Sequence, residues 1–101
     1  MEARATFLDL LGDARRLTAD RLAEAPDYGP LISVDRQLAF LDAAVRADRA
    51  LTDAEVDSVT FGRYAAREFE DSDPEYAEAL HRVYHRVRRG DGVRRERSGG
   101  P

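Results

Sequence analysis

Two histidines and a glutamate near the C-terminal end of the 101-residue chain have a spacing that can bind metal on a helix. Glu78, His81 and His85 lie at positions i, i+3 and i+7. Glu-x-x-His is the helical unit of di-iron bundles, and a histidine pair at i and i+4 can bind zinc. A di-iron site also needs a second Glu-x-x-His, which the sequence lacks. We therefore expect an exposed polar helix face and no bound metal.

Five acidic side chains crowd the segment 68–75. Paired carboxylates can act as general acid and base when a partly dry pocket holds their pKa values apart. A turn between two helices is convex and exposed to water, so it does not form such a pocket. The same carboxylates suit helix capping, solubility or contact with a basic surface on another protein. A plain solvated turn and a partner contact are the two interpretations that remain.

The rest of the sequence offers little for catalysis. It has no cysteine, which excludes disulfides, thiolate nucleophiles and cysteine-ligated zinc. It also contains no Gly-rich phosphate loop, Ser/His/Asp set or dinucleotide fingerprint. The prediction is that the chain is not an enzyme and needs no cofactor.

Charge is distributed unevenly along the chain. Residues 1–79 contain nine arginines and eighteen acidic residues, whereas residues 80–101 contain seven arginines and two acidic residues. An acidic body repels nucleic acid and attracts a basic partner. Arg94, Arg95 and Arg97 have no aromatic neighbour for base stacking, so a solvated tail is favoured over a nucleic-acid site. Without an apolar run of about 20 residues or a leader peptide, we expect a cytoplasmic protein that does not contact membranes.

Apolar residues recur at helical spacings, mostly three to five positions apart, in four segments, which predicts four amphipathic helices. Helix start and stop signals agree with this division. Pro26 stops the first helix, Ser33 is a good N-cap for the second, and Thr52 to Glu55 has the pattern of a capping box. Asp73-Pro74-Glu75 opens the last helix, and Gly90 ends it. The predicted helices span residues 2–25, 34–49, 53–69 and 74–89.

These elements predict an all-α fold, a small four-helix antiparallel-type bundle. A single helical domain would span residues 1–90, followed by a disordered tail rich in Arg and Gly over residues 91–101. The longest internal loop, residues 26–32, carries Tyr28 and should pack against the bundle. Gly62 interrupts the third helix, which points to a close helix–helix approach or a partner contact.

Several short segments share their order and spacing with a known family. They are Tyr28-Gly29, Gln37-Leu38, Thr60-Phe61-Gly62, Arg67-Glu68-Phe69-Glu70, Asp73-Pro74-Glu75, Ala79-Leu80 and Tyr84. In these segments the chain resembles the small all-helical immunity proteins that neutralise NAD(P)+ glycohydrolase toxins of bacterial type VI secretion. The resemblance covers about two thirds of the chain, and the Arg-rich extension after Gly90 lies outside it.

The resemblance implies inhibition by occlusion. In that family the immunity protein binds the toxin domain and blocks its access to NAD(P)+ without processing a substrate. The cognate toxin would be a NAD(P)+ glycohydrolase or another nucleotide-directed toxin, such as an ADP-ribosyltransferase. The alternative is a small helical adaptor or regulator that acts by homo-oligomerisation or protein docking. A homodimer of the free protein is also left open.

We expect two surfaces to contact the partner. One is the loop with Asp27 and Tyr28, where the tyrosine would be an aromatic anchor. The other is the acidic turn with its neighbouring arginines, whose carboxylates would pair with Arg or Lys of the toxin. The predicted partner-binding residues are Asp27, Tyr28, Arg63, Arg67, Glu68, Glu70, Asp71 and Asp73.

Overall fold

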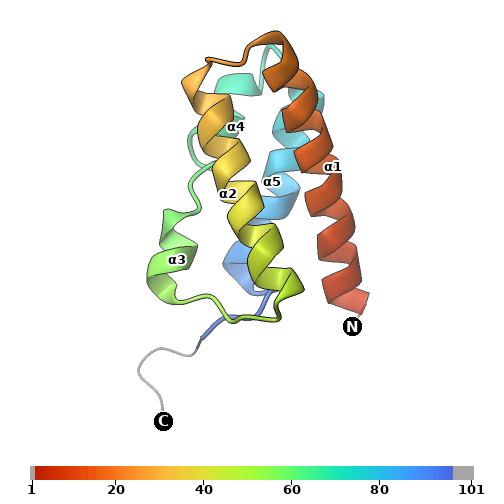
Figure 1. The fold of residues 1–101 in the computed structure, drawn as a ribbon, viewed down its shortest axis with the longest axis vertical. Coiled ribbons are helices and arrows are strands. Elements are labelled where there is room, and N and C mark those ends of the chain that lie inside the picture. Colours follow the sequence, from red (N-terminus) through yellow and green to blue (C-terminus); the bar gives the residue numbers. More distant parts are fainter. Residues whose placement is uncertain (1, 97–101) are drawn as a thin grey trace.

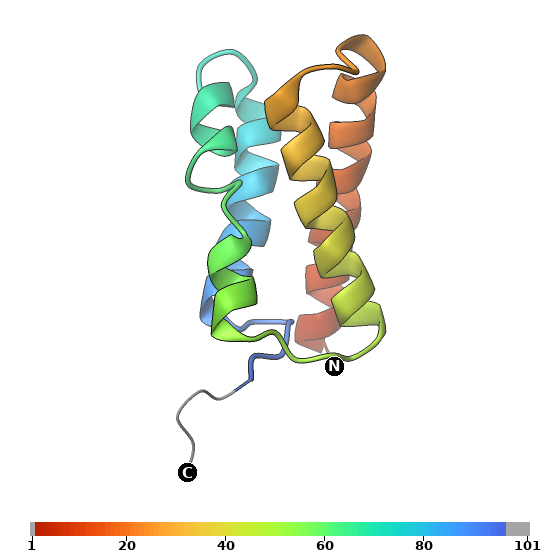
Figure 2. The same ribbon diagram turned by 60° about the vertical axis from the view of Figure 1, so that its left-hand side comes forward.

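Three long helices and two short ones form the fold in the computed structural model, which describes residues 2–96. The long helices α1, α2 and α5 run side by side (Figure 1), and the short helices α3 and α4 follow one another along α5 (Figure 2). None of the helices in this part of the chain is long and apolar enough to cross a membrane. The helices span Glu2–Glu24 (α1), Gly29–Arg46 (α2), Asp53–Ser58 (α3), Ala65–Phe69 (α4) and Pro74–Arg89 (α5).

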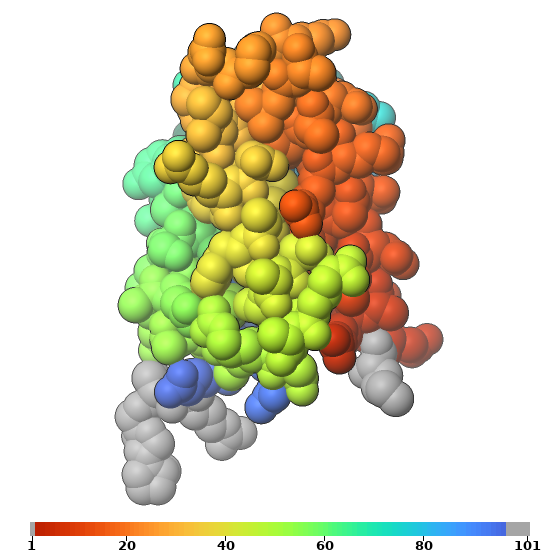
Figure 3. Space-filling model, in the orientation of Figure 1, coloured from red at the N-terminus to blue at the C-terminus, as the bar shows by residue number. Residues whose placement is uncertain are grey.

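One apolar stripe from each long helix builds the core. In α1 the buried positions fall at i, i+4, i+7 and i+11, which places them on one face of the helix. Helix α1 packs against both α2 and α5, and Figure 3 shows α1 and α2 lying side by side on one face of the molecule. The buried residues of these stripes are Phe7, Leu11, Ala14 and Thr18 in α1, Leu31, Val34, Leu38, Leu41, Ala44 and Val45 in α2, and Tyr76, Ala77, Leu80, Val83 and Val87 in α5.

The all-α fold is confirmed, but the predicted third helix over residues 53–69 is divided into α3 and α4. Residues 59–64, the α3–α4 connection, leave the helical path between them. The side chain of Gln37 supplies an acceptor for two backbone amides of this connection, Thr60 N and Phe61 N. Because these amides have a partner outside the helix, the connection satisfies its hydrogen bonds without helical geometry.

The second helix begins four residues earlier than its predicted N-cap. It starts at Gly29 with Pro30 in its first turn, so residues 29–32 are helical and the true loop is short. Proline fits the first turn because its fixed φ suits the helix and its missing N–H would have no partner there. Ser33 lies inside the helix, where its hydroxyl oxygen accepts a hydrogen bond from the side-chain Nε2 atom of Gln37 at 3.0 Å.

The second helix also ends earlier than predicted, at Arg46 instead of Arg49, because the backbone leaves the helical path and reaches a positive φ of 53° at Asp48. The predicted capping box and both ends of the last helix are confirmed. Thr52 and Glu55 form a complete capping box, with the Thr52 amide donating to Glu55 at 2.9 Å and the Glu55 amide donating to Thr52 at 3.1 Å. Asp73 caps α5 by accepting from the Tyr76 amide. Gly90 ends α5 in the left-handed region, with a φ of 69°, where glycine is favoured.

The ordered domain continues past residue 90. Val93 is buried, and Gly92 lies so close to Ala3 and Phe7 that a Cβ atom there would overlap them. Leu51 joins this segment by two backbone hydrogen bonds, donating to Arg94 O at 2.9 Å and accepting from Glu96 N at 2.7 Å. Residues 91–96 therefore belong to the folded body, and residues 97–101 of the predicted tail lie outside the described residues.

Candidate functional site

The structure brings most of the predicted partner-binding residues to one end of the bundle. This end is formed by the loop between α1 and α2, by α4, and by the turn between α4 and α5 (Figure 1). We call it the acidic end and define it by Asp27, Tyr28, Glu68, Glu70 and Asp71. Two segments 40 residues apart in the sequence thus form one surface, which the sequence-based prediction treated as two.

Tyr28 connects the two segments. Its hydroxyl donates a hydrogen bond to Glu68 Oε2 at 2.9 Å, and its ring packs edge-on against Phe69 with centroids 6.3 Å apart. The hydrogen bond to the Glu68 carboxylate raises the pKa of Tyr28, so the phenol remains a donor. The side chain is still 42% exposed. Tyr28 is therefore held in place while much of its surface stays open to a partner.

The other charges of this end have few internal partners. Glu70 lies 3.3 Å from the Nε2 atom of His81, and its side chain is half exposed. Within residues 2–96, the exposed side chains of Asp27, Arg67 and Asp71 form no hydrogen bond or ion pair. A carboxylate can accept several hydrogen bonds, so these groups retain capacity for donors on another molecule.

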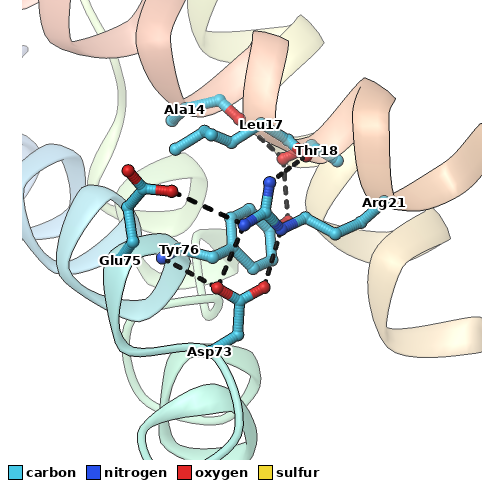
Figure 4. A network of polar contacts seen from close by, with 7 residues as sticks. All are labelled: Ala14, Leu17, Thr18, Arg21, Asp73, Glu75 and Tyr76. Carbon is cyan, nitrogen blue, oxygen red and sulfur yellow. Dashed lines mark hydrogen bonds and ion pairs between the residues drawn. The ribbon is translucent and has the colours of Figure 1, made fainter.

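Asp73 is engaged in hydrogen bonds within the fold. The Arg21 guanidinium donates to both of its carboxylate oxygens, at 2.7 and 3.0 Å, and Figure 4 shows this pair between α1 and the start of α5. Arg21 lowers the pKa of Asp73, and Asp73 in turn raises the pKa of Arg21. A bidentate pair of this kind fixes the angle as well as the distance between two groups. Asp73 thus positions the acidic turn and has little capacity left for a partner.

A buried polar network continues from this pair into the core. The Arg21 guanidinium lies 5.1 Å from the centre of the Tyr76 ring. The Tyr76 hydroxyl is 2.8 Å from Thr18 Oγ1, and Thr18 donates to the Ala14 carbonyl at 2.7 Å (Figure 4). Burial raises the pKa of Tyr76, which keeps its hydroxyl protonated. Every buried side-chain polar atom of this network has a hydrogen-bond partner, so the network anchors α5 to α1 without an unsatisfied group.

Two of the predicted residues and one unpredicted residue lie around α4. Arg67 is on α4, and Arg63 precedes it beside Tyr64 and Tyr84, whose hydroxyls raise its pKa. Tyr64 is 64% exposed, although the sequence-based prediction did not include it among the site residues. Tyr64 falls outside the apolar stripe of the predicted third helix. An aromatic residue in such a position is expected to be exposed, and this was the signal that could have identified it as a site residue.

The histidine cluster has an ordinary structural role. The His81 and His85 rings stack at 6.0 Å, and Glu78 pairs with Arg82 at 2.7 Å. In the part of the chain that the structure describes, no group of three or more His, Asp or Glu side chains could hold a metal ion.

At the opposite end of the bundle, the charged side chains form ion pairs with one another. We call it the arginine end and define it by Asp48, Arg49, Arg94 and Arg95. Arg49 binds Glu55 through two hydrogen bonds of 3.0 Å, Arg94 lies 3.3 Å from Asp48, and Arg95 lies 2.8 Å from Asp53. The Arg49 pair and the capping box lower the pKa of Glu55 to about 2. These arginines therefore fasten residues 91–96 and the start of α3 to the body.

A small helical domain with exposed tyrosines and unpaired charges at one end has the construction of a protein-binding module. The sequence model of the Tsi6 family matches residues 6–89, and the chain belongs to this family. It is 34% identical to a protein named "Immune protein Tsi6" from Pseudomonas aeruginosa, over 90 residues that cover 88% of this chain and 95% of the relative. No solved structure gives a significant match. The resemblance to small all-helical immunity proteins is thereby confirmed.

Proposed function

We propose that the chain is a cytoplasmic immunity protein that binds a cognate type VI secretion toxin and occludes its active site, without catalysing a reaction. The relative named as an immune protein covers nearly the whole chain, which supports this role. The observation that carries the proposal is the acidic end, where Tyr28 and Glu68 hold each other in an exposed position and the side chains of Asp27 and Asp71 have no partner within residues 2–96.

The charge of this surface also suits the proposed class of toxin. An enzyme that acts on NAD(P)+ or another nucleotide needs Arg or Lys groups to hold the phosphates. Carboxylates of the acidic end would pair with such groups and compete with the nucleotide for them. We therefore propose a NAD(P)+ glycohydrolase or another nucleotide-directed toxin as the target. Self-association of the free chain stays a prediction from the sequence.

The decisive experiment reverses the charge of the acidic end. In the triple variant Glu68→Lys, Glu70→Lys and Asp71→Lys, we expect loss of protection when the toxin is co-expressed in bacteria. Removing one paired, desolvated carboxylate from an interface costs about 2–5 kcal/mol of binding. Calorimetric titration with the purified toxin domain measures the loss in affinity.

The matched control places the same charge change on one exposed stripe of α1. Asp9→Lys, Asp13→Lys and Asp20→Lys lie at i, i+4 and i+11, and Asp13 makes only a weak surface pair with Arg16. We expect this control to protect cells as the natural protein does. Full protection by the acidic-end variant would contradict the surface assignment, and equal loss in both variants would indicate a general charge effect.

A further inference from the structure

We propose that Tyr64 is the principal aromatic anchor for the toxin and that the α3–α4 connection is a rigid support that presents it. This inference rests on the proposed function and names the contact that would dominate it. Tyr64 and Tyr28 are the large hydrophobic side chains that stay exposed within the described residues, and Tyr64 is the more exposed of the two. Tyrosine is enriched among residues that dominate binding, because it buries a large rigid area and keeps a hydroxyl for a hydrogen bond.

A side chain from α2 holds the support in place. Gln37 Oε1 accepts hydrogen bonds from the amides of Thr60, at 2.7 Å, and Phe61, at 3.1 Å. Its Nε2 atom also lies 3.2 Å from Thr60 Oγ1. Three hydrogen bonds from a helical residue thus fix two successive residues of a segment that has no regular structure of its own. Gln37 is a positioning residue for Tyr64.

Close packing against α5 fixes the same segment from the other side. A Cβ atom on Gly62 would overlap the ring of Tyr84, so the backbone lies directly on that ring. Phe61 is buried and packs edge-on against Tyr84, with centroids 6.1 Å apart. The Tyr64 amide donates to Thr60 O at 3.0 Å, which closes the turn immediately before α4. A side chain presented by so constrained a backbone loses little conformational entropy when it is bound.

The neighbours of Tyr64 define the partner. Glu68 follows it by one helical turn, with the Glu68 amide donating to Tyr64 O at 3.3 Å, and Glu68 also accepts from Tyr28. The Glu68 carboxylate therefore contacts Tyr28 directly and lies one helical turn after Tyr64 on α4. The Tyr64 hydroxyl lies beside the Arg63 guanidinium. The complementary toxin surface is an apolar pocket large enough for a tyrosine ring, with an Arg or Lys on its rim to meet Glu68.

The test titrates the purified domain of the cognate toxin with the full chain by calorimetry. For Tyr64→Ala we expect the Kd to rise by about 30-fold or more, whereas Tyr64→Phe, which keeps the ring, retains most of the affinity. Arg16→Ala is the matched control, because the long Arg16 side chain is also exposed but lies on α1, outside the acidic end and the α3–α4 connection. We expect the Kd of this control to stay within about threefold of the natural value.

Gln37 variants test the support separately. Gln37→Leu removes the acceptor, so we expect weaker binding with a less favourable binding entropy, because the connection must then be ordered by the toxin. Gln37→Glu keeps an acceptor oxygen for both amides and should restore affinity. A Kd for Tyr64→Ala within threefold of the natural protein would overturn the inference and leave the proposed function intact. If the natural protein itself does not bind the toxin domain, the proposed function fails and the inference fails with it.

Discussion

The arginine end and the acidic end of the bundle both carry many charges, but these charges have different partners. At the arginine end, Arg49, Arg94 and Arg95 each meet a carboxylate of the same chain within 3.3 Å. At the acidic end, Asp27 and Asp71 meet none within the described residues. Charges that are paired internally help to close the domain, whereas exposed charges without an internal partner do not stabilise the fold through a direct contact. This difference is the reason why we propose the acidic end as the surface that binds the toxin.

Asp73 and Asp71 allow this difference to be tested two residues apart. Asp73→Ala removes the N-cap of α5 and leaves Arg21 without its partner, so we expect a loss of about 2 kcal/mol in the free energy of unfolding. Asp71→Ala removes an exposed carboxylate without an internal partner and should change stability by less than about 0.5 kcal/mol. Urea denaturation of both variants measures this. Equal losses would show that the acidic end is as structural as the arginine end.

The Asp71 and Asp73 variants should also differ in their affinity for the toxin domain. We expect Asp71→Ala to weaken binding of the toxin domain although it leaves the fold intact. If Asp71→Ala has no effect on binding while Asp73→Ala abolishes it in the folded protein, the partner contact lies elsewhere and only the position of the turn matters.

A smaller effect is expected at the arginine end, where Glu55 should make stability depend on pH. Its pKa is about 2 in the folded chain and about 4.5 when unperturbed. The unfolded chain therefore binds more protons between these values, so stability from Glu55 is complete above about pH 4.5 and is lost as pH falls toward 2. The gap in the free energy of unfolding between the natural protein and Glu55→Gln should shrink over this range.

Arg49→Gln is the matched control for that measurement, because it removes the other member of the pair. In a chain that already carries Arg49→Gln, the Glu55→Gln substitution should lower the free energy of unfolding by less than it does in the natural protein. The double variant should therefore be no less stable than the sum of the two single losses predicts. A pH dependence that is unchanged in both variants would mean that the Arg49–Glu55 pair does not stabilise the fold.

The sequence predicted most of the fold because the relevant signals are local. The apolar periods of the long helices, the capping box at Thr52 and the stop at Gly90 each act within a few residues. The break after α3 could not be predicted in the same way, since it depends on Gln37 in α2 and Tyr84 in α5. Val93 was likewise assigned to a tail because its burial depends on α1 and Leu51, which are distant in the sequence.

The candidate site was predictable in composition but not in assembly. The acidic residues of the turn and Tyr28 were recognisable from residue type, yet the Tyr28–Glu68 hydrogen bond spans 40 positions. The commitment of Asp73 to Arg21 spans 52 positions, and nothing near Asp73 in the sequence indicates it. Tyr64 was overlooked although its position off the apolar stripe of the predicted third helix already indicated that it is exposed.

Hydrogen–deuterium exchange of the natural protein, free and bound to the toxin domain, tests the central claim most directly. The account predicts slower exchange on binding at residues 25–28 and 60–71, which form the acidic end and the support for Tyr64. It predicts unchanged exchange at residues 48–53 and 91–96, which form the arginine end. Protection confined to the arginine end, with no change around α4, would contradict the account.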